Sequence, residues 1–178
     1  MTTTSPAALA AGHWTVDAAR STATFRVGNL GKEATGTVPV IEGVIDVGAD
    51  GLPVAISGTL DLSAIDTGIP RRDKDLRQRR FLDLDQHPVM SFTSGPAAAT
   101  PAGWQVTGQL GVRGTTVTLT GDVEVSPAGT TSARLTARTS LDRRAIGIRA
   151  PAFMISRRVD ITVTATITHA ERERRPPT

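Results

Sequence analysis

Apolar and polar residues alternate along most of this chain with a repeat of two residues. The clearest example is residues 159–167, where five apolar residues alternate with Asp160 and three threonines. Residues 22–27 show the same repeat. A period of two places successive side chains on opposite faces of a β-strand. The pattern therefore predicts strands with one buried face and one solvated face, as in antiparallel sheets.

Further strand segments are predicted at 32–47, 54–65, 89–94, 104–113, 115–125 and 133–141, with turns rich in glycine and proline between them. The fold class is therefore all-β, with about eight antiparallel strands in a single domain. A meander of this size either closes into a barrel or stacks as a sandwich. The pattern favours an extended eight-stranded barrel, which encloses side chains or one small ligand.

The segment 66–92 interrupts the alternation. Charged residues are dense between Arg71 and Arg80, and the apolar Phe81, Leu82 and Leu84 follow. We expect a short helix or helical turn around residues 70–80, then an apolar plug and a return to strand. A second short helix is expected near residues 142–147.

The two ends of the chain differ from this central region. We expect a disordered leader at 1–12, the barrel domain at 13–170 and a disordered tail at 171–178. The leader has an apolar run too short and weak for a signal peptide or a transmembrane segment. The cytoplasm is therefore the expected location.

Composition excludes several kinds of chemistry. The chain has no cysteine, which excludes disulfides, thiolate metal ligands and a cysteine nucleophile. Its only histidines, His13, His87 and His169, are far apart in sequence, so no metal site is expected. No nucleophile elbow, phosphate loop or Ser/His/Asp arrangement is present. We expect a protein that is not an enzyme and requires no cofactor.

The basic residues are nearly all arginine, and the net charge is +3. Arginine pairs occur at Arg71-Arg72, Arg143-Arg144 and Arg157-Arg158, each close to aspartates. Such neighbours favour surface ion pairs over a phosphate-binding patch. Aromatic residues make up only 3% of the chain, which leaves few side chains to stack on bases. We therefore expect no nucleic-acid partner.

Four separated motifs resemble the YceI-like, polyisoprenoid-binding family. They are the W-x-V-D of 14–17, the charged segment 66–92, the G-Q-L-G-V-R-G-T-T of 108–116 and the L-D-R-R-A-I-G-I of 141–148. Their order and spacing extend the resemblance over residues 13–169. It implies a lipocalin-like barrel whose apolar lumen holds a polyisoprenoid, an isoprenoid quinone or a similar amphiphile, and it implies a homodimer.

The chain also departs from the family pattern. Asn29 and Asp75 stand where a histidine is common, and Leu82 replaces the second aromatic residue of a Phe-Phe-Asp motif. Thr37-Val38 follows Gly36, where Gly-x-Phe is usual. These differences concern the ligand and its head group rather than the barrel.

Burial of a long apolar ligand requires apolar side chains on the inward faces of several strands. Ordinary core packing is the alternative for each candidate. Val44 and Ile45 point oppositely, so at most one of the two lines the lumen unless a bulge intervenes. The lumen candidates are Phe25, Val27, Ile45, Leu76, Phe81, Met90, Phe92, Ile146, Ile148, Phe153, Met154, Ile155, Val159, Ile161 and Val163.

The barrel mouth offers polar candidates. Arg71, Arg72 and Arg143 either meet a ligand head group or form ion pairs with Asp73, Asp75 and Asp142. The segment 70–80, with Leu76 and Phe81 facing inward, is either a moving lid or a fixed cork.

Two hypotheses about function follow. In the first, the barrel binds and carries an apolar small molecule without turnover. In the second, side chains fill the lumen, and an arginine-rich rim binds a protein partner. Lumen volume separates them: we expect little space if Phe25, Phe92, Phe153 and Trp104 all point inward.

Overall fold

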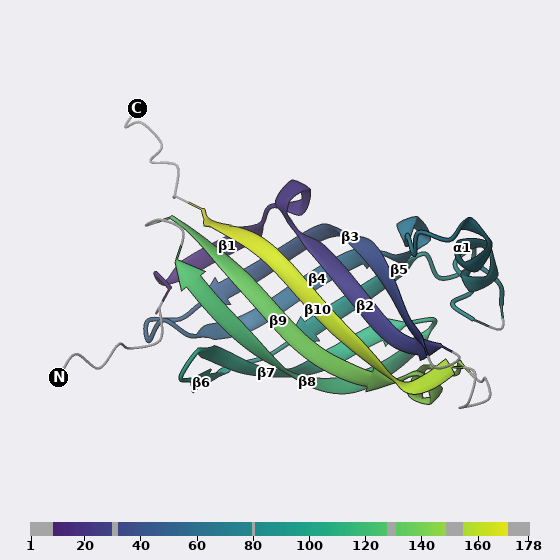
Figure 1. Cartoon of the computed structure of the whole chain (residues 1–178). Helices are drawn as coiled ribbons and strands as arrows, with labels where there is room; N and C mark the ends of the chain where they lie inside the picture. The colour runs from purple at the N-terminus through teal and green to yellow at the C-terminus, as the bar shows by residue number, and fades with distance from the viewer. Residues whose placement is uncertain (1–8, 30–31, 80, 128–130, 149–154, 171–178) are drawn as a thin grey trace.

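The protein is a closed antiparallel barrel in a computed structural model that describes residues 9–29, 32–79, 81–127, 131–148 and 155–170 (Figure 1). Eight strand positions follow one another around the barrel and close through the pairing of the last two strands in the chain. The strands that fill them are β2 (Thr22–Asn29), β3 (Lys32–Val47), β4 (Pro53–Asp61), β5 (Val89–Ser94), β7 (Gly103–Val112), β8 (Thr115–Pro127), β9 (Ser132–Asp142) and β10 (Ile155–His169). The predicted eight-stranded barrel is therefore confirmed.

Two of the eight positions are occupied by interrupted strands. The short β1 (Gly12–Val16) pairs with β3 and β10 beyond the end of β2, and a 3₁₀ turn, η1 (Ala18–Arg20), separates β1 from β2. In the same way β6 (Ala98–Thr100) continues the pairing of β5 along β7. The described ranges thus contain ten strands that fill eight positions.

A bulge in β3 keeps one face of this long strand inside the barrel. Val38 and Val40 are buried before the bulge, and Ile45 and Val47 are buried after it. The register against β4 shifts between Val40 and Glu42, which moves the inward positions from even to odd numbers. Pro39 and Gly43 flank the bulge, and residues of these two types are common where a strand bends.

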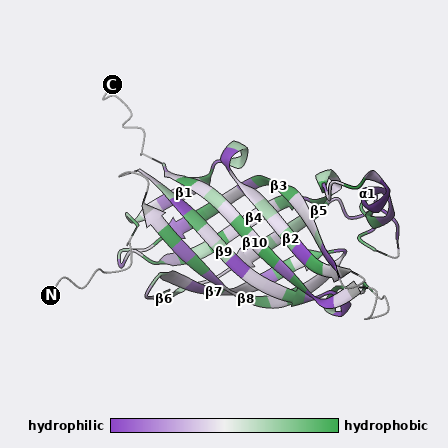
Figure 2. Cartoon of the chain, viewed as in Figure 1, coloured by the Kyte–Doolittle hydropathy of each residue, from purple (hydrophilic) through white to green (hydrophobic). Residues whose placement is uncertain are grey.

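The other helical segments of the described chain lie between strands at one end of the barrel (Figure 1). η2 (Leu62–Ala64) and α1 (Pro70–Leu76) connect β4 to β5, and η3 (Arg143–Ile146) follows β9. Both predicted helical segments are thus present, the second as a 3₁₀ turn. Figure 2 shows α1 as mainly hydrophilic beside strands of alternating hydropathy. Within the described ranges, every helix is too short to cross a membrane.

An apolar cluster lies at the end of the barrel opposite α1. Trp14 and Trp104 are each 1% exposed there, and the Trp14 indole N–H donates a hydrogen bond to the Ala10 carbonyl at 2.8 Å. Leu9 is buried in the same cluster. Residues 9–12 therefore pack against the barrel, although they fall in the segment predicted to be a disordered leader. Residues 1–8 and 171–178 lie outside the described ranges.

Candidate functional site

The barrel interior contains two cavities. One, of about 390 Å³, lies beside α1, and we call it the mouth chamber. The other, of about 210 Å³, lies deeper between the strands, and we call it the inner chamber. Met90 lines both cavities. The mouth chamber alone falls in the range of about 300–1,000 Å³ that is typical of small-molecule sites.

Most lumen candidates from the sequence line one of these cavities. Of the strand and η3 candidates, Phe25, Val27, Met90, Ile146, Ile148 and Val159 line the mouth chamber. Ile45, Met90, Phe92, Ile161 and Val163 line the inner chamber. Ile45 is buried and Val44 is not, which agrees with their opposite directions. Phe153, Met154 and the side chain of Ile155 lie outside the described part of the chain.

The expectation about aromatic residues is not tested, because it required four inward rings and Phe153 lies outside the described ranges. Phe25 lines the mouth chamber, and Phe92 and Trp104 line the inner chamber, yet both cavities remain. Small residues at some of the inward positions contribute to this space. Ala34 and Gly36 of β3, for example, face the mouth chamber. Small residues opposite large ones leave space that a uniformly aliphatic interior would fill.

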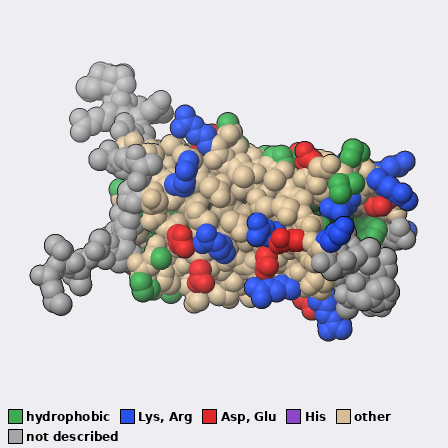
Figure 3. Space-filling view, viewed as in Figure 1, with side chains coloured by type: hydrophobic (Ala, Val, Ile, Leu, Met, Phe, Trp, Pro, Cys, Tyr) green, Lys and Arg blue, Asp and Glu red, His purple; other side chains and the backbone are tan. Residues whose placement is uncertain are grey.

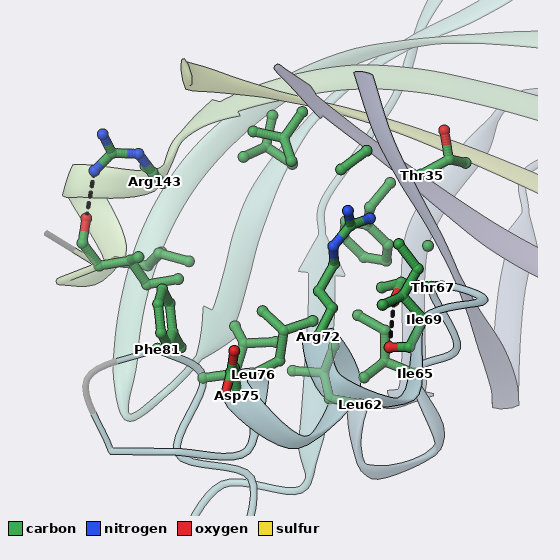
Figure 4. A pocket seen from close by; sticks show the side chains of 18 of the residues that line it. Thr35, Leu62, Ile65, Thr67, Ile69, Arg72, Asp75, Leu76, Phe81 and Arg143 are labelled. Atoms are coloured by element: carbon green, nitrogen blue, oxygen red, sulfur yellow. Dashed lines mark hydrogen bonds between the residues drawn. The ribbon is translucent and has the colours of Figure 1, made fainter. Parts of the chain in front are cut away.

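The connection between β4 and β5 covers the mouth chamber. Leu76 and Phe81 face into the cavity, as predicted, together with Ile65 and Leu62, and Figure 4 shows these side chains converging from η2, α1 and the loop after α1. This cover is tied to the barrel wall. An isolated β-bridge joins Asp66 of the connection to Thr37 of β3.

Local contacts fix the start of α1. The Thr67 backbone N–H and hydroxyl donate to the Asp73 carboxylate at 3.0 and 2.6 Å. Pro70 occupies the first helical turn, where its missing N–H costs nothing. The helix therefore begins at a defined position relative to β3.

Arg71 and Arg72 line the mouth chamber from α1, as expected for head-group candidates. Arg72 is half-buried, and Figure 4 shows its guanidinium extending from α1 toward the barrel strands. Neither arginine makes an ion pair with a carboxylate in the described part of the chain. The ion pairs expected with Asp73 and Asp75 are thus not formed, and both guanidinium groups are available at the cavity.

Arg143 has a different role from the one expected. It is 2% exposed, and its guanidinium donates to the carbonyl oxygens of Ser156 at 3.1 Å and Ile148 at 2.9 Å. The Asp142 carboxylate contacts the Arg144 guanidinium at 3.6 Å. Buried backbone carbonyls require hydrogen-bond donors, and the Arg143 guanidinium supplies them here. The Arg143 side chain also lines the mouth chamber.

Arg113, in the turn between β7 and β8, is a residue that the sequence reasoning did not single out. Its guanidinium donates to the Arg79 carbonyl at 2.6 Å and to the Gly147 carbonyl at 2.9 Å. It therefore joins the cover of the mouth chamber to the turn after β9. A Gly after an arginine marks a tight turn in the sequence, but nothing there indicates which carbonyls the side chain reaches.

Asp142 caps η3. The Arg144 backbone N–H donates to its carboxylate at 2.9 Å. This hydrogen bond, together with the Arg144 guanidinium, lowers the pKa of Asp142 below its ordinary value against an opposing effect of desolvation. The carboxylate therefore stays ionised and holds the turn that carries Arg143.

A closed eight-stranded antiparallel barrel with an apolar interior defines a lipocalin-like fold. The family model of the YceI-like domain matches residues 14–167. The chain belongs to that family, and the resemblance seen in the four motifs is confirmed.

Solved structures have the same fold. BcnA of Burkholderia cenocepacia has a TM-score of 0.74 and 18% identity, covering 85% of this chain and 98% of that one. A polyisoprenoid binding domain of Saccharophagus degradans, implicated in plant cell wall breakdown, has a TM-score of 0.71 and 17% identity, covering 88% and 98%. A UPF0312 protein of Pectobacterium carotovorum is 33% identical over 61 residues, which span 34% of this chain and 32% of that protein.

Proposed function

We propose that the barrel binds and carries a long apolar small molecule, a polyisoprenoid or an isoprenoid quinone, without chemical turnover. The observation that carries this proposal is the pair of apolar cavities inside the barrel, which lie on both sides of Met90. A long, narrow ligand fits two cavities that follow one another inside one barrel. The polyisoprenoid-binding domain with a similar fold supports the same ligand class.

Most of the binding free energy of such a ligand comes from the apolar area that it buries. Each buried methylene-sized group contributes about 0.8 kcal/mol, whereas a neutral hydrogen bond contributes about 0.5–1.5 kcal/mol net. Several isoprene units therefore outweigh any single polar contact. The polar groups at the mouth orient the ligand instead.

Arg71 and Arg72 are the groups that we propose meet the polar end of the ligand. Both line the mouth chamber, and neither is paired with a described carboxylate. A guanidinium donates to carbonyl, carboxylate or phosphate oxygens alike. The tail would then extend past Met90 toward the inner chamber.

The alternative is a barrel with a filled lumen that binds a protein partner through its rim. That hypothesis expects no internal space, whereas the mouth chamber measures about 390 Å³. The unfilled interior therefore favours ligand binding.

Native mass spectrometry of freshly purified protein, followed by organic extraction, tests the proposal. A stoichiometric adduct with an isoprenoid mass is the expected result, and the same spectrum reports whether the protein is the homodimer that the resemblance implies. If the protein is free of ligand and also fails to take up added prenyl quinones or fatty acids, the proposal is wrong and the partner-binding barrel takes its place.

A further inference from the structure

Unpaired positive charge gathers around the mouth chamber. Arg71, Arg72, Lys74 and Arg79 lie within nine residues of one another, and all are exposed or half-exposed. None makes an ion pair with a carboxylate in the ranges that the structure describes. Among the described basic residues of the same connection, Arg77 alone is paired, with Asp85 at 3.4 Å.

The two halves of the barrel carry opposite net charge. We define the mouth half as residues 26–33, 61–88, 112–115 and 142–160, which surround the end that bears α1. Its described residues include 12 Lys and Arg against 9 Asp and Glu, a net charge of +3. The other described residues include 3 against 6, a net charge of −3. Figure 3 shows Lys and Arg side chains gathered at the α1 end.

Exposed apolar side chains lie among these cations. Ile69, just before α1, is 45% exposed and also lines the mouth chamber. Val89, the first residue after the cover, is 41% exposed. Figure 3 shows hydrophobic side chains beside the basic ones at this end. Cations that surround exposed apolar residues make a surface of mixed character, as in proteins that lie at a lipid interface.

We propose that the mouth half docks on the surface of an anionic lipid bilayer. Arg71, Lys74 and Arg79 attract the lipid head groups, and Ile69 contacts the interface. The negatively charged far half is repelled, so the protein binds with the mouth chamber toward the lipid. This orientation would let an apolar ligand pass between the bilayer and the lumen without crossing water. Docking itself does not depend on the identity of the ligand.

The attraction is electrostatic and falls with salt. A basic side chain near an anionic bilayer contributes about 1 kcal/mol, and the Debye length shrinks from about 10 Å at 0.1 M salt to about 3 Å at 1 M. Binding to vesicles of phosphatidylcholine with a third phosphatidylglycerol should therefore be measurable at low salt and lost in 1 M NaCl. Vesicles of phosphatidylcholine alone should bind weakly or not at all.

A matched pair of variants tests the location. The double substitution Lys74→Gln and Arg79→Gln removes two exposed cations that do not line either cavity. It should weaken vesicle binding roughly tenfold to thirtyfold. The control, Arg20→Gln with Arg134→Gln, removes the same charge from the far half and should leave vesicle binding within about twofold. Equal weakening by both variants would show that net charge alone controls binding, and the proposal would then be wrong.

A single label tests the orientation, because the chain has no cysteine of its own. An environment-sensitive dye on Gln78→Cys, after α1, should shift to shorter emission wavelength on anionic vesicles. The same dye on Ala49→Cys, in the turn between β3 and β4 at the opposite end, should not. The reverse result, or the absence of vesicle binding, overturns the proposal. So does binding to a single-stranded oligonucleotide without binding to vesicles.

Failure of docking and failure of ligand binding remain distinguishable. Uptake of a detergent-dispersed prenyl quinone reports the lumen alone, and the Lys74→Gln, Arg79→Gln variant should keep it. Vesicle binding by protein stripped of ligand reports the docking surface alone.

Discussion

The Arg113 guanidinium donates a hydrogen bond of 2.6 Å to the backbone carbonyl of Arg79, and this contact joins the β7–β8 turn to the cover of the mouth chamber. The two residues are 34 positions apart in sequence. The same guanidinium reaches the Gly147 carbonyl at 2.9 Å. A planar fork with several donors suits this task, because one side chain contacts two loops at once.

Arg113→Lys should loosen the cover. Lysine keeps the charge and the turn but lacks the fork, so it cannot hold both carbonyls in the same geometry. We expect amides of residues 72–79 to exchange hydrogen at least several-fold faster, while amides of β9 and β10 keep their protection. The measurement is hydrogen–deuterium exchange by mass spectrometry.

Arg138→Lys is the matched control, because the Arg138 guanidinium donates to Glu124 at 3.0 Å, between β9 and β8 and away from the cover. It should leave exchange in the cover unchanged. Unaltered exchange in Arg113→Lys would show that other contacts hold the cover in place.

Ala34→Phe should fill part of the mouth chamber. Ala34 is 7% exposed and faces that cavity from β3. A phenyl group there displaces several ligand carbons at about 0.8 kcal/mol each, so affinity for a prenyl quinone should fall at least tenfold. The measurement is a quinone-binding titration beside a thermal melt.

The control for packing is Ala133→Phe. Ala133 is 0% exposed in the apolar cluster at the far end and lines neither cavity, so the larger side chain should cost about 1–3 kcal/mol. Ala34→Phe should cost clearly less. Equal destabilisation would mean that the mouth chamber cannot accept added atoms.

Arg143→Met should destabilise the protein by about 1–3 kcal/mol, because the buried carbonyls of Ser156 and Ile148 lose their donor. Arg144→Met removes a neighbour that is exposed and pairs with Asp142 alone, and it should cost less than about 0.5 kcal/mol. Urea unfolding of both variants measures the difference. Similar values for the two would show that Arg143 is dispensable to the fold.

Asp142 should titrate below the ordinary aspartate pKa of about 3.9, because the Arg144 backbone N–H and guanidinium stabilise its ionised form. A lowered folded-state pKa contributes stability that is present above the unfolded-state value and is lost as pH falls through the folded-state value. Arg144→Gln should raise the pKa but not abolish the shift, since the backbone hydrogen bond remains. Carbon-detected NMR titration checks this, with Lys74→Gln as a remote control that should change nothing. A wild-type pKa at or above the ordinary value would contradict the assignment.

The sequence predicted the strands well, because a single buried face imposes a period of two on residues such as those of β10. The sequence did not predict how the interrupted strands pair. Trp14 of β1 pairs with Ile45 of β3 and also with His169 near the other end of the described chain, and no local pattern encodes these pairings.

The candidate site was predicted in part for a related physical reason. Phe25 and Ile161 lie on regular strands. The alternation of apolar and polar residues there predicted that both side chains point into the barrel. Arg143 follows Leu141 by two residues and therefore continues the inward phase of β9, a signal that the neighbouring charges concealed. Leu62 and Ile65 lie in and just after the 3₁₀ turn that follows β4, where alternation no longer predicts which side chains point inward.

Closure of the barrel depends on β10, which lies between β9 and β2. While the chain is being synthesised, every other strand emerges before it. Without β10, the barrel would be an open, curled sheet whose outer strands, β2 and β9, present unpaired amides and carbonyls. Such strand edges pair readily with other chains. The interval before β10 becomes available is consequently the moment of greatest risk of aggregation, and the last-made strand is the one that ends it.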